Sequence, residues 1–162
     1  MNRIVTIAGL ALAATVAGSA NAQLVAHKDL SVTTAVMIAQ TAVQTCKSQG
    51  YNVSAHVLGR AGEVLVAMRG DDTGPQTYEN SFKKAWTSRA QRAPSLNFAN
   101  AVKANPTVGA IHLSNMVPAQ GGLPIMVGED TIGAVGISGA PGGDKDEACA
   151  KAGLDKVAAD LK

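Results

Sequence analysis

Gly121–Gly122–Leu123–Pro124–Ile125 and the later run Ile132–Gly133–Ala134–Val135–Gly136–Ile137–Ser138–Gly139–Ala140 decide the fold of this chain. Glycines alternate there with β-branched and small residues, and the second run ends in a glycine-rich loop that opens a helix. Glycine lets a backbone take positive φ or approach a neighbour closely, at an entropic cost. The stretch therefore indicates a demanding backbone shape, required either by packing or by binding.

The pattern of apolar residues on both sides of this stretch predicts an α+β domain. Hydrophobic spacing and turn residues predict helices at 31–49, 77–89, 96–103 and 144–161, and strands at 53–58, 63–68, 110–113, 124–127 and 131–137. Strands that are grouped rather than alternating singly with helices favour an antiparallel sheet. We therefore expect about five antiparallel strands flanked by helices, in the order α-β-β-α-α-β-β-β-α.

Three helix ends carry recognisable signals. Asp29 or Ser31 can cap the first helix, and Gly50 suits its C-terminal stop. Asp144 with Glu147 forms a D-x-x-E version of the capping box, which predicts the start of the last helix.

The first 22 residues have the features of an export signal. Arg3 supplies a positive n-region, Ile4–Ala17 is an uncharged and mostly apolar stretch, and Ala20–Asn21–Ala22 is a small-x-small cleavage site. The apolar stretch is short for a membrane span of about 20 residues. We expect a signal peptide at 1–22, a single mature domain at 23–162, no transmembrane anchor, and a periplasmic or secreted location.

Charge and aromatic content argue against nucleic-acid binding. The formal net charge is +2 and becomes +1 after removal of the signal, which contains one charged residue, Arg3. Such a balance predicts no general attraction to nucleic acid or anionic lipid. The mature part has five aromatic residues, too few for base-stacking platforms.

Cys46 and Cys149 are the only cysteines. In an exported protein they can form a disulfide, for which loop entropy predicts about 4–5 kcal/mol at a loop of about 100 residues. Two buried free thiols are the alternative, because free cysteine often behaves as a small core residue. Without a CxxC motif or a Cys/His cluster, the sequence does not predict a thiol-redox or structural zinc site.

The histidines are scattered, so they do not predict a metal cage. His27 precedes the first helix, His56 lies in the first strand, and His112 is followed by Met116 four residues later. Any of the three histidines, or Met116, is a possible axial ligand of a haem iron, since one proximal side chain suffices. The alternative is a surface His27, a sheet-face His56 and a loop-edge His112.

Two further features have a binding and a structural interpretation. Lys84 could neutralise a ligand carboxylate such as a haem propionate, or lie on a solvated helix face. Ser138 follows a strand, but its surroundings do not match the G-x-S-x-G nucleophile elbow. The loop from Ser138 to Asp144 could bind an anion at a helix N-terminus, although Asp144, Asp146 and Glu147 already supply negative charge there.

Six motifs, taken in order, resemble the GlcG/HbpS family of glycolate-utilisation-associated and extracellular haem-binding proteins. They are Val53–Ser54–Ala55 with Gly62–Glu63–Val64–Leu65–Val66, Met68–Arg69, Lys84–Ala85–Trp86–Thr87, Gly121–Gly122–Leu123–Pro124–Ile125, Ile132 to Ala140, and Asp146–Glu147–Ala148–Cys149–Ala150–Lys151–Ala152–Gly153. The resemblance covers about residues 29–160 and extends to the carboxy-terminal domain of some corrinoid adenosyltransferases.

The resemblance implies helices on the faces of an antiparallel sheet, homo-oligomers, and haem as the cofactor, with haem degradation or redox and iron sensing in some members. It leads to an exported protein for haem capture, buffering or sensing, with a possible membrane sensor partner. The alternative is a non-haem small-ligand-binding or assembly module linked to glycolate or other small-acid metabolism. An enzymatic role rests on the resemblance alone.

The sequence also departs from the family pattern. Gly59 stands where the first strand usually ends in Asp, and His56 stands where a small or apolar residue is usual. The loop Gly70–Gly74 replaces a shorter turn. Cys149 matches a family position that is Cys even in cytosolic members, which favours a packing role.

Overall fold

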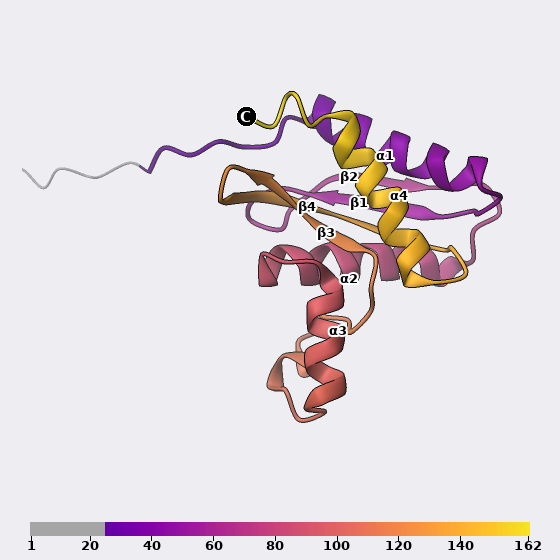
Figure 1. Cartoon of the computed structure of the whole chain (residues 1–162), viewed down its shortest axis with the longest axis vertical. Coiled ribbons are helices and arrows are strands. Elements are labelled where there is room, and N and C mark those ends of the chain that lie inside the picture. Colours follow the sequence, from indigo (N-terminus) through magenta and orange to yellow (C-terminus); the bar gives the residue numbers. More distant parts are fainter. Residues whose placement is uncertain (1–24) are drawn as a thin grey trace, which may run out of the picture.

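The structure is a computed structural model that describes residues 25–162. The predicted signal peptide and its cleavage site lie outside the described residues. The helices are α1 (Val32–Ser48), α2 (Pro75–Gln91), α3 (Ser95–Ala104) and α4 (Gly143–Lys156), with a short 3₁₀ helix η1 (Gly109–His112). The strands are β1 (Ser54–Leu58), β2 (Val64–Arg69), β3 (Gly122–Val127) and β4 (Asp130–Ser138). In Figure 1, α1 and α4 lie on one face of the sheet and α2 on the other, while α3 projects away.

The fold is α+β, as predicted, with a four-stranded antiparallel sheet in the order β2-β1-β4-β3. The prediction of about five strands was wrong at 110–113, where the chain forms η1 rather than a strand. A run of four residues is too short for periodicity to distinguish a strand from a helical turn. No residue of η1 is buried, and the segment pairs with none of the four described strands.

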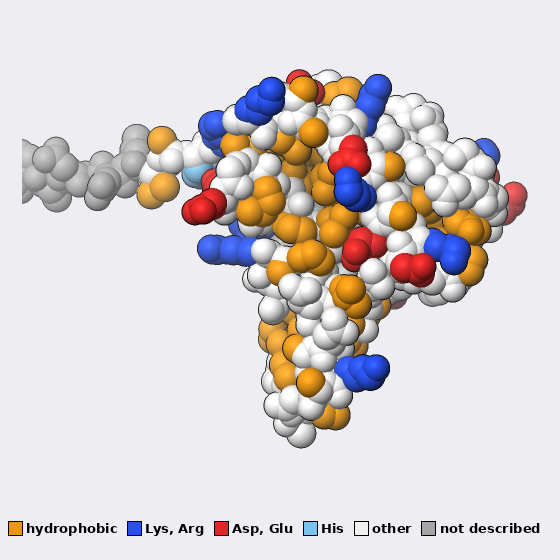
Figure 2. All heavy atoms as spheres, viewed as in Figure 1, with side chains coloured by type: hydrophobic (Ala, Val, Ile, Leu, Met, Phe, Trp, Pro, Cys, Tyr) orange, Lys and Arg blue, Asp and Glu red, His pale blue; other side chains and the backbone are white. Residues whose placement is uncertain are grey.

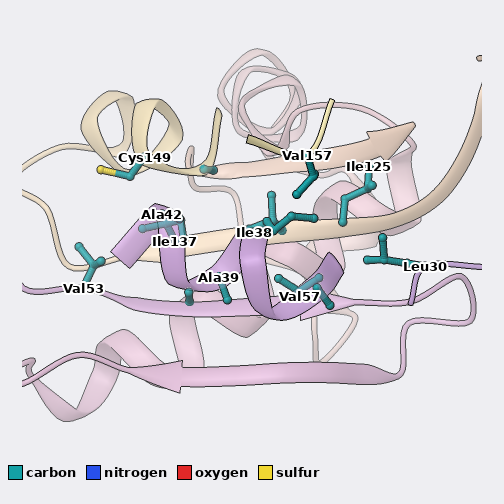
Figure 3. Packing of buried hydrophobic residues seen from close by; sticks show 14 of the residues in the cluster. Leu30, Ile38, Ala39, Ala42, Val53, Val57, Ile125, Ile137, Cys149 and Val157 are labelled. Atoms are coloured by element: carbon teal, nitrogen blue, oxygen red, sulfur yellow. The ribbon is translucent and has the colours of Figure 1, made fainter. Parts of the chain in front are cut away.

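The hydrophobic core fills the space between the sheet and the α1–α4 layer (Figure 3). Ser31 caps α1, accepting a hydrogen bond from the Thr34 N–H at 3.1 Å, and Gly50 follows the helix at φ +82°. The labelled core residues come from both layers: Leu30, Ile38, Ala39, Ala42, Val53, Val57, Ile125, Ile137, Cys149 and Val157. All except Leu30 are at most 1% exposed, so this face of the sheet is closed.

The opposite face is shaped by glycine. Gly136 of β4 lies opposite both His56 of β1 and Gly122 of β3. A Cβ at Gly136 would clash with the carbonyl oxygen of Ser81, and one at Gly122 with that of Lys84. The backbone of α2 therefore rests directly on this glycine pair, which is the close approach that the glycine-rich runs indicated.

Replacement of Gly136 by alanine should destabilise the protein by about 1–3 kcal/mol, because the new methyl group must push α2 off the sheet. Urea denaturation would measure the change. Gly109→Ala is the matched control, since a Cβ there would have nothing within 4 Å. Equal stability of the Gly136 variant and the wild type would contradict this packing.

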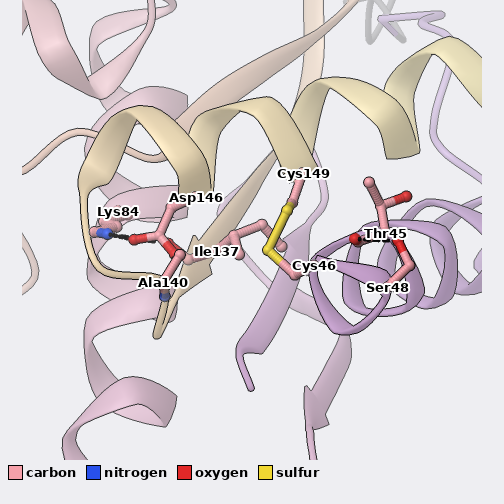
Figure 4. The surroundings of a disulfide bond; sticks show 8 residues. All are labelled: Thr45, Cys46, Ser48, Lys84, Ile137, Ala140, Asp146 and Cys149. Carbon is pink, nitrogen blue, oxygen red and sulfur yellow. Dashed lines mark hydrogen bonds and ion pairs between the residues drawn. A yellow bond between two sulfur atoms is a disulfide. The ribbon is translucent and has the colours of Figure 1, made fainter. Parts of the chain in front are cut away.

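Cys46 of α1 and Cys149 of α4 form a disulfide (Figure 4). Of the two alternatives from the sequence, a disulfide or two free thiols, the structure contains the disulfide. Their Cα atoms are 5.6 Å apart, and the bond joins positions separated by 103 residues. Both side chains are fully buried within the hydrophobic core. The disulfide thus fastens the two helices that cover the same face of the sheet.

The double variant Cys46→Ala/Cys149→Ala should lose about 4–5 kcal/mol of unfolding free energy, because loop entropy is returned to the unfolded chain. Urea denaturation would measure the loss. A thiol assay on the denatured, unreduced wild type should find no free thiol. Two titratable thiols in that assay would contradict the bond.

Candidate functional site

His56 lies under α2 in a hydrogen-bonded arrangement that fixes its tautomer. Its Nδ1 is 2.8 Å from Oγ of Ser81, and that hydroxyl donates to the carbonyl oxygen of Tyr78 at 2.9 Å. Ser81 has a single hydroxyl proton and the Tyr78 carbonyl can only accept, so both hydrogen bonds form together only when Nδ1 of His56 carries the ring proton. Nε2 then holds an unshared electron pair, the form in which histidine binds metals.

Burial keeps this imidazole neutral. His56 is 2% exposed, and desolvation lowers the pKa of its side chain to about 4. The ring of Tyr78 meets it edge-on with centroids 4.5 Å apart, and the ring of Phe82 does so at 5.7 Å. A neutral base is thus held beneath two aromatic rings.

These rings belong to a partly exposed apolar surface, which we call the aromatic face. Its members are Tyr78, Phe82 and Trp86 of α2 together with Val64 and Ala67 of β2. Ala67 pairs with His56 in the sheet, and directly opposite residues share a face. Tyr78 is 44% exposed and Val64 49%, because α2 lies over β1 and β4 and leaves β2 largely uncovered.

The lowered pKa of His56 has a consequence for stability. His56 takes up a proton near pH 6.5 in the unfolded chain but only near pH 4 in the folded protein. Stability should therefore fall as the pH drops from 6.5 to 4, because the unfolded state binds more protons there. His56→Gln should remove this part of the pH dependence in urea denaturation, whereas the exposed His112→Gln should retain it. Identical slopes for His56→Gln and the wild type would contradict a buried neutral imidazole.

Lys84 and Asp146 form a buried ion pair beside the glycine-rich loop (Figure 4). Nζ of Lys84 lies 2.7 Å from Oδ2 of Asp146 and donates to the carbonyl oxygen of Ile137 at 3.1 Å. Oδ1 of Asp146 accepts from the Ala140 N–H at 2.9 Å. Each of the two side chains is 4% exposed, so Lys84 does not lie on a solvated helix face. Removal of one partner would leave an uncompensated buried charge.

The predicted capping box was wrong. Helix α4 begins after Gly142, and no side chain caps it. Asp146, one turn further on, is turned toward Ala140 and Lys84 instead. Burial raises the pKa of the Asp146 carboxyl, and the Lys84 charge opposes this shift. Asp146 therefore binds the glycine-rich loop and Lys84, and does not cap the helix.

A cleft of about 630 Å³, here called the loop cleft, opens above this pair. Polar groups and glycines line it: Thr77 and Asn80 of α2, Ser138 at the end of β4, and the loop Gly139–Gly143. Asn80 donates to Oγ of Ser138 at 3.0 Å. Among the described residues, no histidine lines the loop cleft.

The five candidate residues from the sequence do not converge on one site. Nε2 of His27 lies 3.2 Å from Asp29, with its side chain 43% exposed. His112 is exposed at the end of η1, and Met116 is 7% exposed. Lys84 lies at the loop cleft and His56 beneath Tyr78. Of the five, only His56 belongs to an ordered group of side chains with a free metal-binding atom.

Haem fits the aromatic face in chemistry but not as an enclosed ligand. The loop cleft is polar, and other clefts formed by residues 25–162 have volumes from about 180 to 350 Å³, at the small end for ligand pockets. The aromatic face offers flat rings for a macrocycle, and the His56 imidazole packs edge-on against two of them, Tyr78 and Phe82.

Within residues 25–162, no group of three or more His, Cys, Asp or Glu side chains could hold a metal ion. No helix in the same range is long and apolar enough to cross a membrane.

The sequence interpretation did not single out the aromatic face. Tyr78, Phe82 and Trp86 recur at i, i+4 and i+8, which places them on one side of a helix. That spacing was the available signal. It did not show which face of the sheet α2 would cover. It therefore could not show that the rings of Tyr78 and Phe82 would pack against His56.

These features define a single-chain α+β domain that carries a buried neutral histidine under an aromatic helix face. The chain belongs to the HbpS-like family of haem degrading proteins, whose model matches residues 30–155. The recognition of the GlcG/HbpS family from the sequence motifs is therefore confirmed.

Solved structures show the same fold. The crystal structure of HbpS is 32% identical, covers 83% of this chain and 94% of that one, and has a TM-score of 0.78. The protein ORFY of Klebsiella pneumoniae is 25% identical over 86% of this chain and 96% of its own, with a TM-score of 0.76. A PduOC:Heme complex is 22% identical over 78% of this chain and 93% of its own, with a TM-score of 0.70, a likeness of fold alone.

A curated relative, a 15.0 kDa protein of Citrobacter freundii from the dhaT-dhaS intergenic region, is 31% identical over 86 residues. The match spans 51% of this chain and 61% of the relative.

Proposed function

We propose that this protein binds haem on the aromatic face, with Nε2 of His56 as the iron ligand. The observation that carries the proposal is the His56–Ser81–Tyr78 hydrogen-bond chain, which leaves the metal-binding nitrogen of a neutral imidazole unprotonated. The family to which the chain belongs and the PduOC:Heme complex support haem as the ligand.

The arrangement has the parts that a histidine ligand requires. A ligating histidine usually donates its other ring N–H to a nearby acceptor, which orients the ring and strengthens the ligand. Oγ of Ser81 fills that role at 2.8 Å. Because burial lowers the pKa of His56 to about 4, protons do not compete for Nε2 at neutral pH. Bound there, haem supplies a redox-active iron.

The open aromatic face suits one side of a macrocycle. Tyr78, now edge-on to His56, would have to move, and Phe82 and Trp86 would contact the ring system. A second copy of the chain would cover the other side of the haem, in keeping with the homo-oligomers that the family resemblance implies.

Haemin titration of the purified protein should give a shifted Soret band at near-stoichiometric ratio, which His56→Ala should weaken or abolish. His27→Ala and His112→Ala are the matched controls and should behave as the wild type. Tyr78→Ala should accelerate binding, because it removes the ring that covers the imidazole.

Only the spectrum of free haemin in the wild-type titration would exclude haem binding. Loss of the Soret shift in His112→Ala, with the shift retained in His56→Ala, would move the iron ligand to η1. Circular dichroism of each variant separates ligand loss from unfolding.

The protein acts outside the cytoplasm in this proposal, in the periplasm or after secretion. The support is the sequence of residues 1–22 with its Ala20–Asn21–Ala22 cleavage site. Its role is haem capture, buffering or sensing, the last with a membrane sensor as partner.

A small polar ligand in the loop cleft is the second candidate function. The buried charges of Lys84 and Asp146 beside a polar cleft of about 630 Å³ favour it. A small acid linked to glycolate or related metabolism is the class of ligand suggested by the family resemblance. The haemin titration separates the two candidates, because a protein that serves only the loop cleft gives no Soret shift.

A further inference from the structure

A small pocket at the C-terminal end of α2 contains a concentration of positive charge. It has a volume of about 220 Å³ and is lined by Arg60, Ala61, Gly62, Trp86, Arg89, Ala90 and Arg92. We call it the arginine pocket. Trp86 also belongs to the aromatic face, so the two surfaces adjoin.

The three arginines differ in how they are paired. Arg60 is engaged: its Nη1 and Nη2 lie 2.9 and 2.7 Å from the carboxylate of Asp130, and Nη2 donates to the Lys28 carbonyl at 2.6 Å. Among the described residues, Arg89 and Arg92 have no ion pair. The free charge of the pocket is therefore that of Arg89 and Arg92.

Arg89 contains an unsatisfied buried donor. Its Nε is buried and has no hydrogen-bond partner in residues 25–162. Buried donors in native proteins are nearly always paired, so an orphaned N–H requires an explanation. Burial and the charges of Arg92 and Arg60 lower the pKa of Arg89, while Asp130 and Glu63 act in the opposite sense without bonding to it. An anion bound at the guanidinium groups of Arg89 and Arg92 would relieve this crowding of positive charge.

The helix end accounts for only part of this arrangement. Basic residues favour the C-terminal turn of a helix, where carbonyl groups carry partial negative charge. Here the N–H groups of Arg92 and Ala93 both approach the Ser88 carbonyl oxygen, so the backbone already caps that end. The dipole favours a positive charge at this position but supplies no acceptor for Nε of Arg89.

We propose that the arginine pocket binds an oxyanion, a carboxylate or phosphate group held by the guanidinium groups of Arg89 and Arg92 against the ring of Trp86. Guanidinium groups bind such anions through two parallel N–H bonds. The volume admits one small anion rather than a large ligand. Two sources share this chemistry: a free anion such as inorganic phosphate, and a carboxylate of a haem on the adjoining aromatic face. The second source rests on the proposed function, and the first does not.

Trp86 is the only tryptophan of the chain, so its fluorescence reports directly on the pocket. Inorganic phosphate, added at constant ionic strength with sodium chloride, should change this fluorescence to saturation in the wild type. Arg89→Gln should weaken phosphate binding at least about tenfold, because it removes charge-assisted hydrogen bonds. Arg89→Lys should weaken it as well, since lysine keeps the charge but lacks the fork.

Lys103→Gln is the matched control, because it removes a positive charge from the last turn of α3, away from the pocket, and should leave the titration unchanged. Arg92→Gln provides a second test if Arg89→Gln fails to fold, as judged by circular dichroism.

Haemin and its dimethyl ester distinguish the two sources. If a haem carboxylate occupies the pocket, Arg89→Gln should weaken haemin binding about tenfold and leave binding of the ester unchanged. Saturable phosphate binding alone supports a free-anion site. If only a difference between haemin and its ester is seen, and it depends on Arg89, the anion in the pocket is a haem carboxylate. If the folded variant shows neither effect, the anion-binding role of the arginine pocket is overturned. A Soret shift in the wild type would still leave the proposed haem binding intact.

Discussion

The close approach of α2 to the glycine pair Gly122 and Gly136 is the constraint on which this face of the molecule depends. Where most helices rest on side chains, α2 rests with the backbone of Ser81 and Lys84 against the sheet. This depth brings the Ser81 hydroxyl to His56 and lets Nζ of Lys84 reach the Ile137 carbonyl beyond. Larger residues at the two glycines would lift the helix and break both contacts. The glycines thus act through packing, and through packing they position the groups that we assign to binding.

Sequence patterns were sufficient for the general architecture and insufficient where local and tertiary signals compete. Long amphipathic periodicity located α1, and the grouping of strands gave an antiparallel α+β fold. The segment 110–113 has strand-like residues but pairs with none of the strands in residues 25–162, and pairing is decided by the rest of the chain. Asp144 and Glu147 have capping-box spacing, yet α4 begins after Gly142 without a side-chain cap. Asp146 instead pairs with the buried Lys84, which lies 62 residues away in the sequence. A local sequence pattern cannot predict such a distant pairing.

The candidate site shows the same division. Sequence reasoning could name His56 as a possible iron ligand and Lys84 as a possible partner of a ligand carboxylate, because their side chains have that chemistry. It could not show that His56 meets Ser81, since that contact depends on the register of α2 across the sheet. The tautomer, the lowered pKa and the aromatic covering of His56 all follow from this register. Residue identity gave the candidates, and tertiary placement selected among them.

A chain with a near-zero net charge can still have local surfaces that favour particular ligands, and three such surfaces lie along α2. Its N-terminal end borders the polar loop cleft, its middle carries the aromatic rings over His56, and its C-terminal end forms the arginine pocket. Net charge governs long-range attraction, which screening limits to about 10 Å at moderate salt. The unpaired guanidinium groups of Arg89 and Arg92 act at shorter range, inside a pocket next to an apolar surface. A ligand with a flat apolar body and an anionic edge can contact the aromatic face and the arginine pocket at once. A polyanion can contact only the arginine pocket. The near-neutral composition, which predicts no general attraction to nucleic acid, is therefore compatible with selective binding of an amphipathic anion.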